Sequence, residues 1–87
     1  MDVTIKMKSE KYRAMQDRLT EAIRASGKST TALARAVKLS PSSISRYESH
    51  KQEPSLDAVI LLCLALNLSP TYLLFGIGEK ALHTPQQ

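Results

Sequence analysis

Two amphipathic segments with helical spacing meet in the middle of this 87-residue chain, separated only by residues 38–40. Ser29 precedes the first segment, Thr30 to Val37, at the N-cap position, where a hydroxyl accepts a bond from an unpaired backbone N–H. Ser40-Pro41 opens the second segment, because Pro at the first helical position lacks only an N–H that has no helical partner. A connection this short predicts two helices joined by a tight corner.

The other boundary signals along the chain are helical as well. Gly27 ends a first amphipathic stripe, Ser55 opens a fourth helix, and Ser69-Pro70 repeats the cap before Gly76 ends a fifth. The predicted helices cover residues 9–26, 30–37, 41–49, 55–66 and a short segment from Pro70 to Gly76. The residues predicted to face inward are Tyr12, Met15, Leu19, Ala22, Ile23, Leu33, Ala34, Val37, Leu39, Ile44, Tyr47, Val59, Leu62, Cys63 and Leu66. The pattern predicts an all-α chain.

We expect three parts: an N-terminal arm at residues 1–8, one compact domain at residues 9–78, and a flexible tail at residues 79–87. In the arm, Val3, Ile5 and Met7 alternate with polar residues, a period-two pattern typical of a strand. Three interpretations stay open for it: a disordered arm, an arm that grips DNA, and a short strand that pairs across a dimer.

Composition and motifs exclude several classes of function. The single cysteine, Cys63, cannot form an intramolecular disulfide, and the longest apolar run, Ala58 to Leu66, is far shorter than the roughly 20 residues that cross a bilayer. We therefore expect a cytoplasmic protein without membrane contact. His50 and His83 stand in a loop and a tail, and no nucleophile with a base, metal-ligand cluster or phosphate-binding Gly loop is visible. We expect no enzyme, cofactor, metal or small-molecule substrate.

Positive charge is concentrated in the first part of the chain. Residues 1–52 hold 11 of the 12 Lys and Arg residues and have a net charge of +6, whereas residues 53–87 have a net charge of −2. A one-sided basic surface is typical of proteins that neutralise nucleic-acid phosphates, although many basic faces are only solvated.

The run TTALARAVKLSPSSISRYE, from Thr30 to Glu48, resembles the helix-turn-helix core of the XRE-like family of phage lambda-type repressors and Cro proteins. The resemblance covers about residues 15–78 and includes Pro54-Ser55 and the Leu-Leu-Phe-Gly segment that ends at Gly76. It implies a compact, five-helix lambda-repressor-like domain with a short N-terminal arm, which binds double-stranded DNA by placing its third helix in the major groove.

Four positions depart from the pattern of the family. Lys38 and His50 stand where the family prefers Gly, so each must adopt a turn with a side chain present. Thr30 replaces a Gln that often binds phosphate. Ile23 replaces an Arg that often pairs with the Glu at position 48, which leaves Arg24 as the possible substitute.

With Ile44 and Tyr47 turned inward, helical spacing turns the opposite face of the third helix toward a groove. The predicted base-contacting residues are Pro41, Ser42, Ser45 and Arg46. Arg46 is the strongest reader, because a guanidinium can bond guanine O6 and N7 together; a phosphate contact or a surface ion pair is the alternative. The predicted phosphate-contacting residues are Thr30, Thr31, Arg35, Lys38, Ser43, Ser49 and Lys51, each with a solvated side chain as its alternative.

The fourth helix has a second apolar stripe, formed by Leu61 and Leu64 with Asn67 or Leu68 beyond. An exposed stripe of this kind usually marks an interface, and the alternative is that the N-terminal segment folds over it. We expect a homodimer through Leu61, Leu64 and Leu68. The functional hypothesis is a sequence-specific transcription regulator, a dimeric repressor that binds a palindromic operator. The alternative is a protein-interaction module, such as an antitoxin-like subunit, that binds a partner through the fourth helix.

Overall fold

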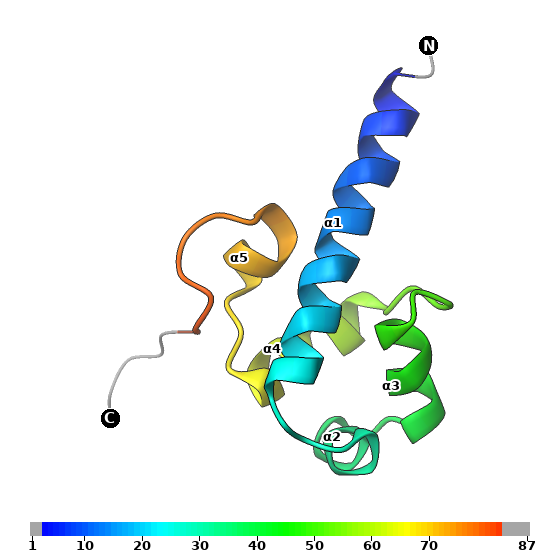
Figure 1. Cartoon of the computed structure of the whole chain (residues 1–87), viewed down its shortest axis with the longest axis vertical. Coiled ribbons are helices and arrows are strands. Elements are labelled where there is room, and N and C mark those ends of the chain that lie inside the picture. The colour runs from blue at the N-terminus through cyan, green and yellow to red at the C-terminus, as the bar shows by residue number, and fades with distance from the viewer. Residues whose placement is uncertain (1–2, 83–87) are drawn as a thin grey trace.

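The computed structural model describes the backbone of residues 3–82 and the side chains of Glu10 and residues 12–82. Within these residues the chain is all-α, as predicted, and the long axis of the molecule follows the first helix (Figure 1). The helices are α1 (Val3–Ala25), α2 (Thr30–Val37), α3 (Pro41–Glu48), α4 (Leu56–Leu66) and α5 (Pro70–Phe75).

The four helices α2 to α5 begin where the predicted caps stand. A serine hydroxyl accepts a bond from the backbone N–H three residues on at the start of α2, α3, α4 and α5; these serines are Ser29, Ser40, Ser55 and Ser69. Gly76 ends α5 with a φ of 72°, a left-handed conformation that costs glycine little. Asn67 ends α4 in the same left-handed backbone conformation, with a φ of 54°. Local chemistry therefore sets these boundaries.

A single hydrophobic core lies where the helices meet. α1 packs against α3 and α5, and α2 packs against α3 and α4, so every helix contributes apolar side chains (Figure 1). The most deeply buried residues include Leu33, Ile44, Leu62 and Leu73. The buried apolar residues are Met15, Leu19, Ile23, Leu33, Ala34, Val37, Ile44, Tyr47, Ala58, Val59, Leu62, Cys63, Leu68 and Leu73. The predicted inward faces are confirmed, with Tyr12, Ala22, Leu39 and Leu66 packed at the edge of the core.

The strand interpretation of the N-terminal segment is wrong over residues 3–8, because α1 begins at Val3 and these residues extend the first helix. Contact of this segment with DNA stays a prediction. The segment contains no Gly or Pro, and Lys and Met are good helix formers, so a helix that is anchored further along can continue through the alternating pattern. Residues 1 and 2 lie outside the described part.

The prediction of a flexible tail is also wrong for its first residues. The backbone N–H of Ser69 donates to Lys80 O at 2.7 Å, and the N–H of Leu82 donates to Asn67 O at 3.0 Å, which forms an isolated antiparallel bridge between Leu68 and Ala81. A single bridge gives no sequence period, so the pattern did not indicate it. Residues 83–87 of the predicted tail lie outside the described part.

Candidate nucleic-acid interface

The corner between α2 and α3 is fixed by backbone bonds. Lys38 has a φ of 59° and a ψ of 41°, and its N–H donates to Ala34 O and Arg35 O at the end of α2. The N–H of Leu39 also donates to Ala34 O, at 2.9 Å, and Ser40 then caps α3. The predicted turn with a side chain at position 38 is therefore confirmed, and it sets the direction in which α3 leaves α2.

α3 has one buried face and one exposed face. Ile44 is fully buried and Tyr47 nearly so, which holds the helix against the core. The four residues predicted to contact bases all lie on the exposed face: Pro41, Ser42, Ser45 and Arg46. The packing therefore presents these side chains together, at the surface that a groove would meet.

Hydrogen bonds within α3 already engage several of its serines. The Ser40 hydroxyl lies 3.2 Å from the Ser42 hydroxyl and 3.0 Å from the Ser43 hydroxyl. The Ser49 hydroxyl donates to Ser45 O at 3.0 Å, so it must leave this bond before it can donate to a phosphate. These serines are weaker candidates for contacts with DNA than the basic residues.

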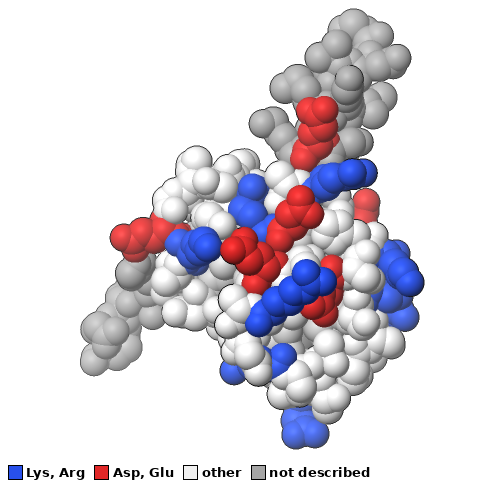
Figure 2. Space-filling model, viewed as in Figure 1, with Lys and Arg blue, Asp and Glu red and all other residues white. Residues whose placement is uncertain are grey.

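The predicted phosphate-contacting residues lie on α2, on α3 and in the turns that follow these two helices. Thr31, Arg35, Lys38, Ser49 and Lys51 are exposed, whereas Thr30 and Ser43 are half-buried. Figure 2 shows basic side chains at the outer edges beside α2 and α3, and both acidic and basic side chains along α1.

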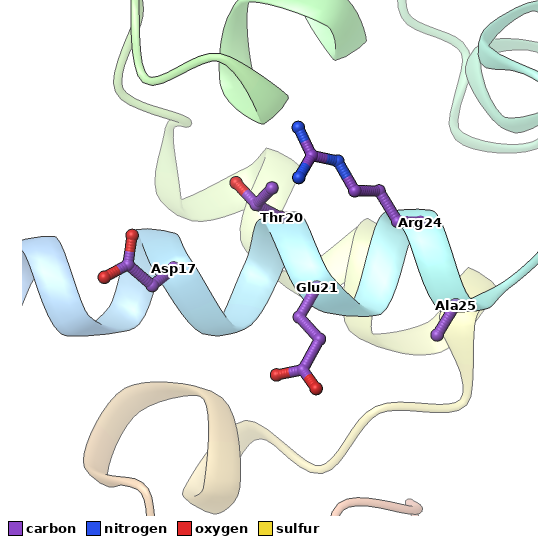
Figure 3. A pocket seen from close by; sticks show the side chains of 5 residues that line it. All are labelled: Asp17, Thr20, Glu21, Arg24 and Ala25. Carbon is purple, nitrogen blue, oxygen red and sulfur yellow. The ribbon is translucent and has the colours of Figure 1, made fainter.

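An ion pair ties the end of α3 to α1. Arg24 Nε lies 2.9 Å from Glu48 Oε2, so Arg24 does replace the Arg that the family places one residue earlier. The Thr20 hydroxyl donates to Glu48 O at 2.8 Å. Figure 3 shows Thr20 and Arg24 on one side of α1 and Glu21 on the other, around a surface hollow of about 510 Å³. These contacts fasten the C-terminal end of α3 to α1.

Sequence reasoning missed the side chain that contacts Arg46. The Arg46 Nε–H donates to Gln52 Oε1 at 2.7 Å, across the turn that follows α3. This bond engages Nε and leaves both terminal nitrogens of the guanidinium outside it. No spacing rule for helices links these two positions, because Gln52 lies beyond the end of α3.

A second surface, on α4 and α5, is apolar. Leu64 is 60% exposed and Leu61 40%, which agrees with the predicted stripe, but Leu68 is 5% exposed. Leu68 is therefore wrongly assigned to that stripe, because the turn at Asn67 directs it into the core. The sequence analysis also overlooked five exposed apolar residues: Leu56, Ile60, Leu74, Phe75 and Ile77.

Three of the exposed apolar residues meet at a groove of about 330 Å³. Leu56, Leu74 and Phe75 line it together with Tyr12 of α1. An all-round apolar composition of α4 was the signal for this surface, since Asp57 is the helix's one charged residue. α4 therefore has more apolar surface than its own domain covers.

Cys63 is a free cysteine that lies in the core. Burial raises the pKa of the Cys63 thiol, which disfavours the reactive thiolate. No group of three or more metal-ligating side chains occurs in the described part of the chain. None of the helices described combines the length and the hydropathy that crossing a membrane requires.

An outward-facing helix that is held by a tight corner, a buried anchor and basic flanks defines a helix-turn-helix DNA-binding protein. The helix-turn-helix family model matches residues 19–73, and the chain belongs to this family, of the XRE or Cro/C1 type. It is thus a DNA-binding helix-turn-helix regulator. Comparison with curated proteins and with solved structures gave no match.

Proposed function

We propose that this regulator is a dimeric repressor that occupies a palindromic operator and reads it through α3 in the major groove. The observation that carries the proposal is the exposed face of α3, where Arg46 stands beside small polar residues while Ile44 and Tyr47 anchor the opposite face. Arg46 donates to guanine O6 and N7. Ser42, Ser45 and Pro41 contact neighbouring base edges, and the serines discriminate weakly because a hydroxyl can both donate and accept.

Basic and polar side chains around α3 position the protein on the DNA backbone. Contacts of this kind fix the register and carry no sequence information, and their strength falls as salt rises. The proposed phosphate-contacting residues are Thr30, Thr31, Arg35, Lys38, Ser43, Ser49 and Lys51. With few strong base readers, the shape of the DNA contributes to the specificity.

The dimer is proposed to form through α4 and α5. Leu61 and Leu64 are exposed, and helical spacing joins Leu64 through Ile60 to Leu56. Leu56 and Phe75 line the groove. A two-fold axis through this surface makes the contact self-complementary and can place two copies of α3 about 34 Å apart, one turn of DNA.

Selection of bound duplexes from a random pool, at near-physiological salt, tests the proposal. We expect an enriched palindrome that has a guanine in each half-site. Arg46→Ala should relax the preference at that guanine, whereas the matched variant Arg35→Ala should weaken binding to all sequences alike. If a pool bound by the folded wild-type protein shows no enrichment, the proposal is refuted.

Sedimentation tests the dimer separately. Leu64→Asp introduces a charge into the proposed interface and should yield monomers at tens of micromolar, where the wild type is dimeric. Ala36→Asp adds the same charge on an exposed position of α2 and should leave the dimer intact. A wild type that sediments as a monomer at that concentration, without DNA and with it, would contradict the interface.

The exposed leucines of α4 also support a second candidate, an antitoxin-like module that binds another protein through this helix. Under that function, Leu64→Asp abolishes binding of the partner protein and Arg46→Ala leaves it unchanged. A DNA regulator shows the Arg46 dependence described above.

A further inference from the structure

The chain folds back on itself directly after α3. The backbone N–H of Lys51 donates to Arg46 O at 2.8 Å, and that of His50 donates to Tyr47 O at 3.2 Å. His50 has a φ of 65°, the left-handed conformation that closes such a turn. This reversal returns Gln52 to the side of α3 that carries Arg46.

Contacts with α1 hold this turn in place. His50 Nε2 lies 3.2 Å from Thr20 Oγ1 and 3.5 Å from Asp17 Oδ1. Because the single Thr20 hydroxyl hydrogen donates to Glu48 O, the Thr20 oxygen accepts from His50, and Nε2 carries a hydrogen. The segment that contains Gln52 is thus fastened to the scaffold on its other side.

Gln52 in turn restricts the guanidinium of Arg46. Its Oε1 accepts the Nε hydrogen at 2.7 Å, and this bond leaves the terminal nitrogens outside it. An arginine side chain has many rotamers, and ordering it on binding costs conformational entropy. A bond that orders the side chain before DNA arrives reduces that cost without occupying the donors needed for a base.

We propose that Gln52 is a positioning residue that sets the specificity of Arg46, by orienting its guanidinium for two bonds to one guanine. This inference rests on the proposed function, because it assumes that α3 reads bases. Gln52 itself acts through Arg46 and does not need to touch the DNA.

The test is a double-mutant cycle on the selected operator. The measured quantity is the ratio of Kd values for the operator and for a copy with the guanine replaced. Arg46→Ala should remove most of this ratio, which for a two-bonded contact is about five- to 150-fold. Gln52→Ala should lower the ratio by about two- to tenfold, the effect of one net hydrogen bond, and should have no further effect in the Arg46→Ala background.

Two further variants separate positioning from general effects. Gln52→Glu keeps an acceptor for the Nε hydrogen, so it should preserve the ratio while weakening binding to every sequence through its negative charge. Glu53→Ala changes an exposed neighbour and should leave the ratio unchanged. Gln52 and Glu53 are both exposed, so the melting temperature of each variant should stay near that of the wild type.

The outcomes distinguish this inference from the proposed function. Suppose that the wild type selects a guanine but Gln52→Ala keeps the full ratio of Kd values, or lowers this ratio by the same factor in the wild-type and the Arg46→Ala backgrounds. The positioning role is then wrong, and the proposed function as a DNA regulator is unaffected. If the wild type selects no sequence at all, the proposed function fails and this inference fails with it.

Discussion

Replacing Lys38 by glycine should stabilise the fold and weaken DNA binding at the same time. Lys38 holds a φ of 59° and a ψ of 41° at the corner between α2 and α3, and its side chain is exposed. A left-handed conformation costs a residue with a Cβ about 1 to 2 kcal/mol. Glycine removes that cost. It also lowers stability by about 0.4 to 1 kcal/mol, because it increases the conformational entropy of the unfolded chain. The free energy of unfolding should therefore rise by about 0.5 to 1 kcal/mol.

Lys38→Gln is the matched control, because it removes the same charge and retains the Cβ. Urea unfolding should give Lys38→Gln a stability within about 0.5 kcal/mol of the wild type and Lys38→Gly a higher one. The melting temperature of the glycine variant should rise by about 4 °C, as expected for a domain of this size. Both variants lose one proposed phosphate contact, so the slope of log K against log salt should become shallower by about 0.9 in each.

The two readouts test separate steps of the reasoning. A glycine variant no more stable than the glutamine variant would refute the assignment of strain to position 38. Unchanged salt slopes in both variants would show that Lys38 does not meet a phosphate, and would leave the strain argument intact.

Other changes have equally specific expectations. Glu48→Gln should cost about 0.5 kcal/mol in low salt and almost nothing in 1 M NaCl, because Arg24 is largely exposed in that ion pair; an equal loss at both salts would contradict this. Leu62→Ala should cost about 2 to 5 kcal/mol in urea unfolding, and Leu64→Ala, in the monomer, much less; similar losses would contradict the burial pattern. The Tyr12 hydroxyl oxygen is buried without a hydrogen-bond partner in the described part of the chain, so Tyr12→Phe should stabilise by about 1 kcal/mol. Burial, and then Glu53 and Tyr47, raise the Tyr12 pKa above its usual 10.0, so the contribution of Tyr12 to stability should be constant below that pH and be lost above it. A Tyr12→Phe variant whose stability falls as steeply above pH 10 would refute that attribution.

The helices of the domain were predictable because their signals are local. Ser29, Ser40, Ser55 and Ser69 cap helices through N–H groups three residues away, and the period of apolar residues identifies the face that is buried. The exposed side of α3 follows from the same period. Four proposed base-contacting residues could therefore be placed on one face without a structure.

The errors arose where a neighbouring element decides the outcome. By helical spacing, Leu68 continues the stripe of Leu64, but the left-handed turn at Asn67 directs it into the core. The exposure of Leu56 and Ile60 depends on which sides of α4 the other helices cover. Helical period alone gives the relative directions of the side chains on α4. It does not say how much of the surface of α4 the other helices cover.

By itself, the sequence determined where α2 to α5 begin, the corner between α2 and α3 and most of the core, because caps, turns and apolar period act over a few residues. Only the tertiary structure decided that Arg24 reaches Glu48, that Gln52 holds Arg46, and that residues 80–82 pair with residues 67–69. The physical reason is that these contacts form between side chains or backbone groups outside any shared helix. Their partners are set by how the chain turns and packs.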